Sequence, residues 1–335
     1  MYSTDKVPMD TKPILSRYQT SRDVGVDLVQ DRRHDAHSET EYFSTSSGNN
    51  IAYQCYGRTD SGRLGDLVFF NGLFASGSIW KYQYRHQQLL DQFRLVVFDY
   101  RCQGQSSQVL IPFTLEDVID DAAALFGHLE LKRPSFIGHS LGGILLQRLA
   151  VEATAKTRNH CSPTSMVLVN TGDRIPVETS LFFGQLHHLF RQAATLQEKG
   201  LMHQSESLTA SIFLRLIKRL FSERYLEMFS GFESELVRRY IANNRCARSV
   251  VHFMDAIFVN KPIPPPLGTP IHSPMLVITG RDDTIFPVTS VRSLLASANN
   301  AIVHVFDRTG HSCMMEQKAR FNSLLTQFLI SAYVK

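Results

Sequence analysis

The fold of this chain is indicated most clearly by one segment, Ser135-Phe136-Ile137-Gly138-His139-Ser140-Leu141-Gly142-Gly143. A short apolar run leads directly into a glycine-rich turn, and an apolar segment of helix length, Ile144–Ala153, follows it. Glycines at positions 138 and 142 leave space where a Cβ atom would collide in a sharp turn between a strand and a helix. We therefore expect Ser140 to stand out from the backbone at the positive end of a helix dipole, which favours developing negative charge.

Short apolar runs recur along the chain, separated by segments long enough for helices. The runs are almost continuously apolar, which is typical of strands buried on both faces of a parallel sheet. An amphipathic helix is predicted at Leu115–Leu129. This alternation predicts an α/β fold with a mostly parallel, doubly wound sheet, whose chemistry lies at the carboxyl ends of the strands. The runs are Leu67–Phe70, Leu95–Phe98, Ser135–Gly138, Met166–Val169, Met275–Thr279 and Ile302–Phe306.

The first part of the chain differs from this pattern. Residues 1–40 are polar and mixed in charge, and we expect them to form a loosely attached extension. A strand pair is predicted next, at 42–44 and 50–56, with a Ser-Gly-Asn turn between its strands. The opening residues do not have the pattern of a secretory signal, and no apolar stretch is long enough to predict a transmembrane segment. We therefore expect a cytoplasmic protein.

A second departure occurs between the runs at 166–169 and 275–279. Residues 173–260 contain no strand-like run and predict long helices at 181–196, 207–221 and 233–258. The segment 261–270 holds five prolines and cannot be helical. We expect a helical cap, 173–260, inserted into a core made of residues 41–172 and 261–335. The alternative is that these helices simply belong to the core.

The composition argues against several classes of protein. Apolar residues make up 43% and charged residues 20% of the 335 residues, as in an ordinary globular protein. The formal net charge is only +4, and no basic stripe interleaved with aromatic residues occurs, so no nucleic-acid partner is expected. The five cysteines are widely spaced without metal-ligand spacing, so we expect free thiols, no bound metal and no cofactor. Cys313 is interpreted as a free thiol beside the site.

Together with its strand and helix, the Gly-His-Ser-Leu-Gly motif makes residues 42–335 resemble the α/β-hydrolase superfamily. Its members carry a nucleophile, an acid and a histidine in that order along the chain. Here one later strand ends in Gly280-Arg281-Asp282-Asp283, and the next leads to Thr309-Gly310-His311. The resemblance implies Ser140 as the nucleophile, Asp283 as the acid and His311 as the base. Asp282 is the alternative acid.

The resemblance also implies an oxyanion hole made of two backbone N–H groups. One donor is expected at Leu141, directly after the nucleophile, and the other at Leu73, within Asn71-Gly72-Leu73-Phe74. The commonest family pattern has His-Gly where this chain has Asn-Gly, which weakens any transfer of substrate class. In the segment Asp99–Ser106, which matches the family pattern D-x-R-x-x-G-x-S, the aspartate and arginine are expected to tie together the loop beside this site.

The predicted function is that of a serine hydrolase that cleaves a carboxylic ester or thioester of a small-molecule acyl substrate through an acyl-enzyme. The chain also resembles a branch that includes bacterial 3-hydroxyacyl transferases and the synthase of 3-hydroxyalkanoyloxyalkanoates. An acyltransferase uses the same intermediate with an alcohol as acceptor, so it is an alternative. A non-catalytic ligand-binding receptor on the same fold is another.

Basic residues gather in the expected cap. They form either a solvated helix face or a docking surface for an acyl-carrier protein or coenzyme A. Epoxide hydrolases and dehalogenases normally have Asp at the nucleophile position, so Ser140 disfavours both. The clustered basic residues are Arg215, Lys218, Arg219 and Arg224.

Overall fold

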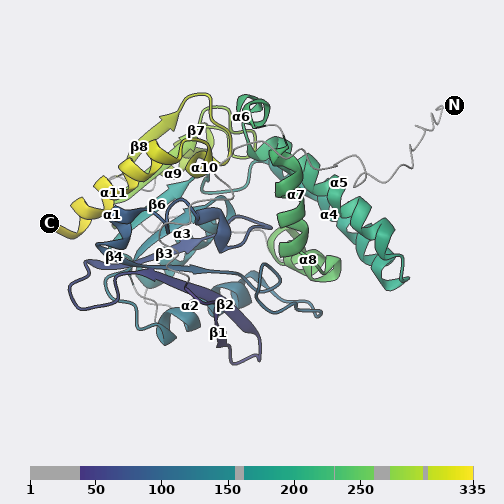
Figure 1. Ribbon diagram of the computed structural model, residues 1–335, viewed down its shortest axis with the longest axis horizontal. Coiled ribbons are helices and arrows are strands. Elements are labelled where there is room, and N and C mark those ends of the chain that lie inside the picture. Colours follow the sequence, from purple (N-terminus) through teal and green to yellow (C-terminus); the bar gives the residue numbers. More distant parts are fainter. Residues whose placement is uncertain (1–37, 155–161, 230, 260–271, 297–300, 335) are drawn as a thin grey trace.

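Eight strands form one sheet in the order β1-β2-β4-β3-β5-β6-β7-β8 (Figure 1). The computed structural model describes residues 38–154, 162–229, 231–259, 272–296 and 301–334. Strands β1 and β2 run antiparallel to their neighbours, and every other pairing is parallel. The strands are β1 Glu41–Ser44, β2 Asn50–Gly57, β3 Gly65–Phe70, β4 Phe93–Phe98, β5 Ser135–His139, β6 Ser165–Val169, β7 Met275–Gly280 and β8 Ala301–Phe306.

The central strands β3, β5, β6 and β7 are buried over their whole length. Their continuous apolar runs are explained by helices on both faces of the sheet, as a parallel sheet requires. The side chains of Leu67 and Phe69 pack in one core with α1 and α11, while those of Val68 and Phe70 pack in a second core with α2, α3 and α9. The predicted α/β fold with a mostly parallel, doubly wound sheet is confirmed.

The two helices predicted before residue 173 are both present. The helix predicted at 115–129 is α2, and the helix expected after the glycine-rich turn is α3. None of the described helices is both long and apolar enough to cross a membrane. The helices are α1 Gln87–Leu90, α2 Leu115–His128, α3 Leu141–Thr154, α4 Val177–Glu198, α5 Met202–Leu220, α6 Glu223–Met228, α7 Phe232–Asn243, α8 Ala247–Met254, α9 Ser290–Ala296, α10 Cys313–Glu316 and α11 Lys318–Val334, with a 3₁₀ turn at Gly77–Trp80 and a π-helical turn at Asp255–Val259.

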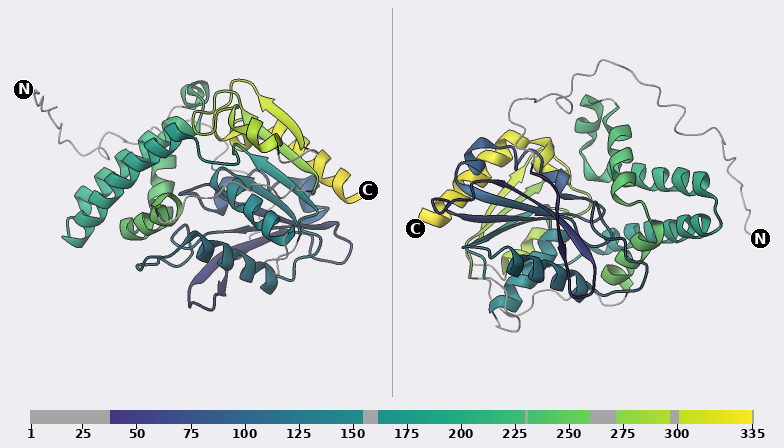
Figure 2. Two further views of the ribbon diagram at one scale, coloured as in Figure 1. Left: turned by 180° about the vertical axis from the view of Figure 1, so that it is seen from behind. Right: turned by 60° about the horizontal axis from the view of Figure 1, so that its bottom comes forward.

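Helices α4 to α8 all lie between β6 and β7 in the chain. Figure 2 shows α4 and α5 side by side, extending past the edge of the sheet. The helix predicted at 233–258 is interrupted, because α7 ends at Asn243 and α8 begins at Ala247. Between them the side chain of Asn244 donates hydrogen bonds to the carbonyls of Phe74 and Tyr240, both at 2.8 Å, and so fixes a turn in the chain. The short helix α6 was not predicted.

Two of the expected segments lie largely outside the described residues. The N-terminal extension, 1–40, is described only from residue 38, and the proline-rich segment 261–270 is not described. Cys161 is also outside the described part of the chain.

The loop after β4 is tied to its surroundings by two charged residues. The carboxylate of Asp99 accepts hydrogen bonds from the backbone N–H groups of Gly77 (2.8 Å) and Gln105 (2.9 Å). Burial nevertheless raises the pKa of Asp99 to about 6. Arg101 forms a two-pronged ion pair with Asp121 of α2, at 2.6 and 2.7 Å. Asp99 and Arg101 therefore hold the loop after β4 in place, in the structural role expected for them from the sequence.

Replacing Arg101 by Met is expected to lower the free energy of unfolding by about 3–5 kcal/mol, because it leaves the buried Asp121 carboxylate without its partner. The side chains of this pair are only 5% and 7% exposed. Urea denaturation followed by circular dichroism measures the change. The matched control is Arg58→Met, which breaks an exposed Arg–Asp pair and should change stability little. Equal losses in the two variants would contradict this account.

Candidate active site

Ser140 occupies the turn between β5 and α3 with a backbone φ of +55°. This left-handed conformation is unusual for a residue with a side chain and persists only where neighbours fix it. The N–H of Ser140 donates to the carbonyl of Val169 at 2.9 Å, and its carbonyl accepts from the hydroxyl of Thr171 at 2.8 Å. The end of β6 therefore holds the serine in place.

The two glycines of the motif are required by close packing. A Cβ atom on Gly138 would lie 2.2 Å from the Leu146 side chain, and one on Gly142 would lie 2.5 Å from the carbonyl oxygen of Phe70. Both distances are shorter than real Cβ contacts, and the second involves backbone that cannot move aside cheaply. The sharp turn that exposes Ser140 thus depends on both glycines, as the sequence predicts.

Asp283 and His311 meet at the carboxyl ends of β7 and β8. The Nδ1 of His311 donates to the Oδ2 of Asp283 at 2.8 Å. The Oδ1 of the same carboxylate accepts from the backbone N–H groups of Ile285 (2.8 Å) and Phe286 (2.9 Å). Both side chains of the pair are almost fully buried. Asp282, the alternative acid, is exposed, and the structure therefore places Asp283 against the imidazole.

Asn170 links the ends of three strands at this point. It directly follows β6 and is fully buried. Its side-chain nitrogen donates to Asp283 Oδ2 (2.9 Å) and to the carbonyl of Gly310 (3.1 Å), while its oxygen accepts from the N–H of Cys313 (3.3 Å). Asn170 was not predicted from the sequence as a site residue. Its only signal was a polar side chain immediately after a buried strand.

His139, the residue before the serine, lies against His311, with 4.7 Å between ring centres. Its Nε2 donates to the backbone carbonyl of His311 at 2.8 Å, because a carbonyl can only accept. The pKa of His139 is lowered to about 3, mainly by burial and in part by the nearby His311. His139 is therefore neutral, and no second positive charge opposes protonation of His311.

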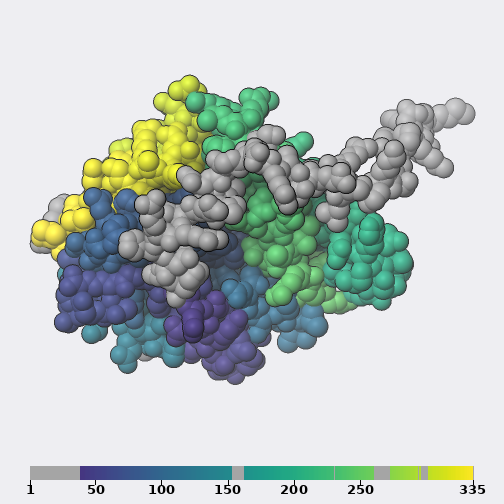
Figure 3. Space-filling model, in the orientation of Figure 1, coloured from purple at the N-terminus to yellow at the C-terminus, as the bar shows by residue number. Residues whose placement is uncertain are grey.

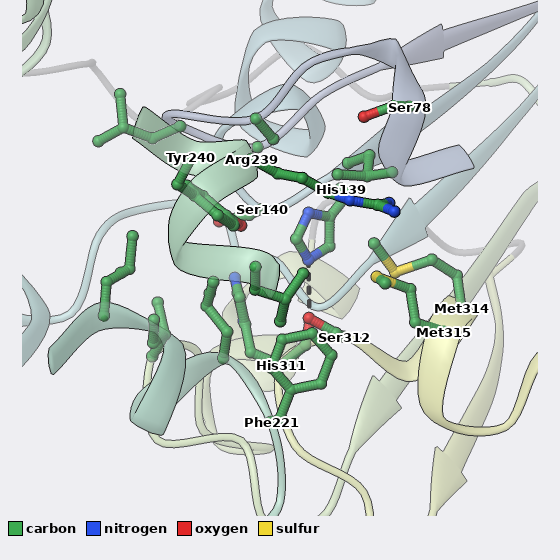
Figure 4. Close-up of a pocket in the computed structure, with 18 of the residues that line it drawn as sticks. Ser78, His139, Ser140, Phe221, Arg239, Tyr240, His311, Ser312, Met314 and Met315 are labelled. Carbon is green, nitrogen blue, oxygen red and sulfur yellow. Dashed lines mark hydrogen bonds between the residues drawn. The ribbon is translucent and has the colours of Figure 1, made fainter. Parts of the chain in front are cut away.

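Ser140 and His311 line one narrow cavity of about 50 Å³. In Figure 4 the imidazole of His311 is directed toward Ser140. None of the hydrogen bonds among the described residues joins their side chains, which is common in sites without a bound substrate. Since Nδ1 is bound to Asp283, the nitrogen available to Ser140 is Nε2. The helices between β6 and β7 contribute to the cavity Phe183, Leu216, Leu220, Leu236, Arg239 and Tyr240.

Leu73 and Leu141 flank a smaller hollow that also includes Ser140. Leu141 is the first residue of α3, so its N–H has no carbonyl one turn earlier to bind. Within the described part of the chain, neither the Leu73 nor the Leu141 N–H donates a hydrogen bond. Two free donors therefore lie beside the serine.

Asn71 holds the loop that carries Leu73. Its side-chain nitrogen donates to the carbonyl of Phe98 at 2.7 Å, and its oxygen accepts from the indole N–H of Trp80 at 3.0 Å. Asn71 is fully buried. The Asn-Gly variant of the family pattern thus anchors this loop to the end of β4.

Glu316 connects the histidine turn to helix α6. Its Oε1 accepts from the backbone N–H groups of Gly310 (3.0 Å) and Ser222 (3.2 Å), and its Oε2 accepts from the Ser222 hydroxyl (2.5 Å). Burial raises the pKa of Glu316, and the negative charge of Asp283 adds to this effect. In Figure 3 the α6 region packs directly against the C-terminal part of the chain.

A cysteine nucleophile or a group of metal ligands would provide a different chemistry near this site. Burial raises the pKa of the Cys313 thiol well above its usual value, which makes it a poor nucleophile. Cys313 is fully buried and is not part of the cavity wall. Among residues 38–334 that the structure describes, no group of three or more His, Cys, Asp or Glu side chains could hold a metal ion.

Comparison with known proteins gives a consistent result. A sequence model described as the alpha/beta hydrolase family matches residues 67–324. A protein of Pantoea ananatis provisionally named carbamate hydrolase RutD is 24% identical over 268 residues, covering 78% of this chain and 87% of that protein. The 3-oxoadipate enol-lactonase 2 of Acinetobacter baylyi is 23% identical over 272 residues, covering 81% and 90%.

Solved structures show the same fold. The enol-lactonase from Burkholderia xenovorans LB400 superposes with a TM-score of 0.68 at 22% identity. The match covers 87% of this chain and all of that chain (100%).

Replacing Asp283 by Asn is expected to slow covalent labelling of Ser140 by a fluorophosphonate about a thousandfold or more at pH 7. The N–H groups of Ile285 and Phe286 would retain the amide oxygen, so the amide NH₂ would face His311 and force the proton onto Nε2. The labelling rate, followed by mass spectrometry, measures this. Asp282→Asn is the matched control and should label at the wild-type rate. A similar loss in both variants would remove the distinction between the two acids.

Proposed function

The chain belongs to the alpha/beta hydrolase family, and from that premise we propose that it cleaves a carboxylic ester or thioester through an acyl-enzyme formed on Ser140. Among its relatives is an enol-lactonase, and a lactone is a cyclic ester. The observation that carries the proposal is the bond from His311 Nδ1 to Asp283, because it leaves Nε2 for the serine that lines the same cavity.

The proposed reaction begins when Ser140 Oγ attacks the carbonyl carbon and its proton passes to Nε2 of His311. Asp283 fixes the imidazole tautomer and stabilises the imidazolium. The tetrahedral intermediate collapses as the imidazolium gives its proton to the departing oxygen or sulfur. Water then attacks the acyl-enzyme and gives a proton to Nε2, and the imidazolium returns that proton to Ser140 Oγ as the Ser140–acyl bond breaks and the acid leaves.

The negative oxygen of each intermediate needs preorganised donors. We assign this role to the backbone N–H groups of Leu73 and Leu141, which have no other partner in the described part of the chain. Losing one such donor costs about 3 kcal/mol of transition-state stabilisation. The neutral state of His139 supports the same step, because a charged ring there would oppose formation of the His311 imidazolium.

We also propose that residues 173–260 act as a cap on a core formed by 41–172 and 261–335. The support is the composition of the cavity wall, which combines Ser140 and His311 of the core with Phe183, Leu216 and Tyr240 of the helices. Such a cap excludes water and shapes the substrate site.

Part of the basic cluster that could dock a carrier protein makes contacts within the chain. In the basic cluster of the helices, Arg219 is already engaged. Its guanidinium donates to the Thr284 carbonyl at 2.9 Å and lies 4.6 Å from the centre of the Phe182 ring. The acyltransferase remains a second candidate because both reactions share the acyl-enzyme, and a receptor is distinguished by lack of turnover.

The test is turnover of p-nitrophenyl esters of increasing acyl length, with mass spectrometry of the trapped acyl-enzyme. The wild type is expected to release p-nitrophenol and to gain the acyl mass on Ser140. Ser140→Ala should lose about 10⁵-fold or more of the activity, because the nucleophile is absent. Addition of an alcohol separates hydrolysis from transfer, since a transferase yields the new ester.

The matched control is Ser312→Ala, which removes a different hydroxyl of the cavity wall, on the residue that follows His311. This variant should still form the acyl-enzyme on Ser140. Persistent labelling of Ser140→Ala would overturn the proposal, and labelling of the wild type without turnover of any ester or thioester would favour the receptor.

A further inference from the structure

We propose that the cavity accepts a substrate that carries a carboxylate group in addition to its ester or thioester bond, and that Lys81 and Arg239 bind this carboxylate. The proposal rests on the proposed function and specifies its substrate class. Both cations line the same cavity as Ser140, although they come from distant parts of the chain. Lys81 follows the 3₁₀ turn Gly77–Trp80, whereas Arg239 lies on α7.

Arg239 presents unused hydrogen-bond donors. Its Nε donates to Glu235 Oε1 at 2.7 Å, one turn earlier on α7. Within the described part of the chain its two terminal nitrogens donate to no acceptor. Figure 4 shows this side chain extending from α7 across the pocket toward the side of Ser78 and Met314. A guanidinium held at Nε with its terminal nitrogens free matches the geometry that binds a carboxylate through two parallel hydrogen bonds.

The ammonium group of Lys81 is not paired with an acid in the part of the chain that the structure describes. None of the carboxylates among the described residues lies within ion-pair distance of its ammonium group. Its nitrogen lies 4.7 Å from the ring centre of Tyr82, and Lys318 approaches the same ring at 4.4 Å. A half-buried ammonium without a counter-ion is costly, so a charged ligand is the natural source of the missing negative charge.

The charges around Lys81 are strongly unbalanced. The pKa of Lys81 is lowered to about 8, mainly by burial and in part by repulsion from Arg239, Arg85 and Lys318. Glu235 is the one acid that acts against this shift, and it is already shared between Arg238 and Arg239. A carboxylate placed between Lys81 and Arg239 would relieve this repulsion.

The remaining wall of the cavity is mainly apolar and fits an uncharged chain. The cations thus provide the charged contact, and the apolar wall would hold the part of the substrate nearest the scissile bond. A carboxylate is the anion we propose, because its two oxygens match the parallel donors of the Arg239 guanidinium. The apolar lining includes Leu73, Phe183, Leu216, Leu220, Phe221 and Met314.

The experiment compares anionic esters with neutral ones of the same shape. One pair places the charge on the acyl side, the p-nitrophenyl monoester of glutaric acid against p-nitrophenyl pentanoate. The second pair places it on the leaving group, 4-carboxyphenyl acetate against 4-carbamoylphenyl acetate. The uncatalysed rate of each ester is subtracted. The wild type is expected to favour the anionic member of at least one pair by about tenfold or more in kcat/KM.

Lys81→Met and Arg239→Met should each reduce that preference about tenfold while turnover of the neutral ester stays measurable. Turnover of the neutral ester also shows that a variant has folded. The matched control is Arg238→Met, which removes the neighbouring positive charge on α7 from a side chain that is 59% exposed and outside the cavity. This control should retain the wild-type preference.

Absence of a preference in both pairs would overturn the inference while leaving the proposed hydrolysis intact, because the neutral esters and the fluorophosphonate test that activity separately. An equal effect of Arg238→Met and Arg239→Met would also overturn it, since general charge steering would then explain the preference. Failure of every ester would instead count against the proposed function.

The preference should also depend on pH in a defined direction. Lys81 loses its proton as the pH rises through about 8, so the anionic-to-neutral ratio of kcat/KM should fall between pH 7 and 9.5. The ratio cancels any pH dependence that the two esters share. The groups that face Lys81 are Tyr82, Arg85, Glu235, Arg239 and Lys318.

In Lys81→Met the ratio should be low and constant across this range. A decline of the same size in that variant would show that another of these groups, and not Lys81, determines the pH dependence.

Discussion

The hydrogen bond between His311 and Asp283 is the contact on which the site depends, and the parallel sheet makes it possible. Strands β6, β7 and β8 are neighbours that run in the same direction, so their carboxyl ends meet at one edge. Asn170, after β6, joins the acid of the β7 loop to the turn that carries the histidine. Ser140 reaches the same edge because β5 pairs with β6. A chain with these residues in another strand order would not bring them together.

The sequence was sufficient for the features that local chemistry determines. The central strands β3, β5, β6 and β7 were predictable because both of their faces are buried and their apolar runs are therefore continuous. The turn at Ser140 was predictable because Gly138 and Gly142 have no room for a side chain. The expected acid, base and oxyanion residues lie together in the structure, while their catalytic roles remain predictions.

Other features depend on contacts that no local pattern reveals. The break after α7 arises because Asn244 binds the distant carbonyl of Phe74. The neutral state of His139 follows from burial against His311. Lys81 and Arg239 are separated by more than a hundred residues, and only the folded chain brings them to one cavity. The charge pattern of the sequence instead indicates the basic cluster that contains Arg215, Lys218, Arg219 and Arg224.

The contact between Glu316 and Ser222 also has a mechanical consequence. The cavity is smaller than most ligand sites, which hold roughly 300 Å³ or more. Larger substrates therefore require the helices between β6 and β7 to move away from the core. Outward movement of α6 would break the hydrogen bonds from the N–H and the hydroxyl of Ser222 to Glu316. The Glu316 carboxylate would then keep only the hydrogen bond from the Gly310 N–H. The far ends of α4 and α5 extend beyond the sheet (Figure 2). We infer that α6 keeps its contact with Glu316 when the other helices move apart. The entrance of the cavity can then widen while the backbone of Gly310, next to His311, keeps its position.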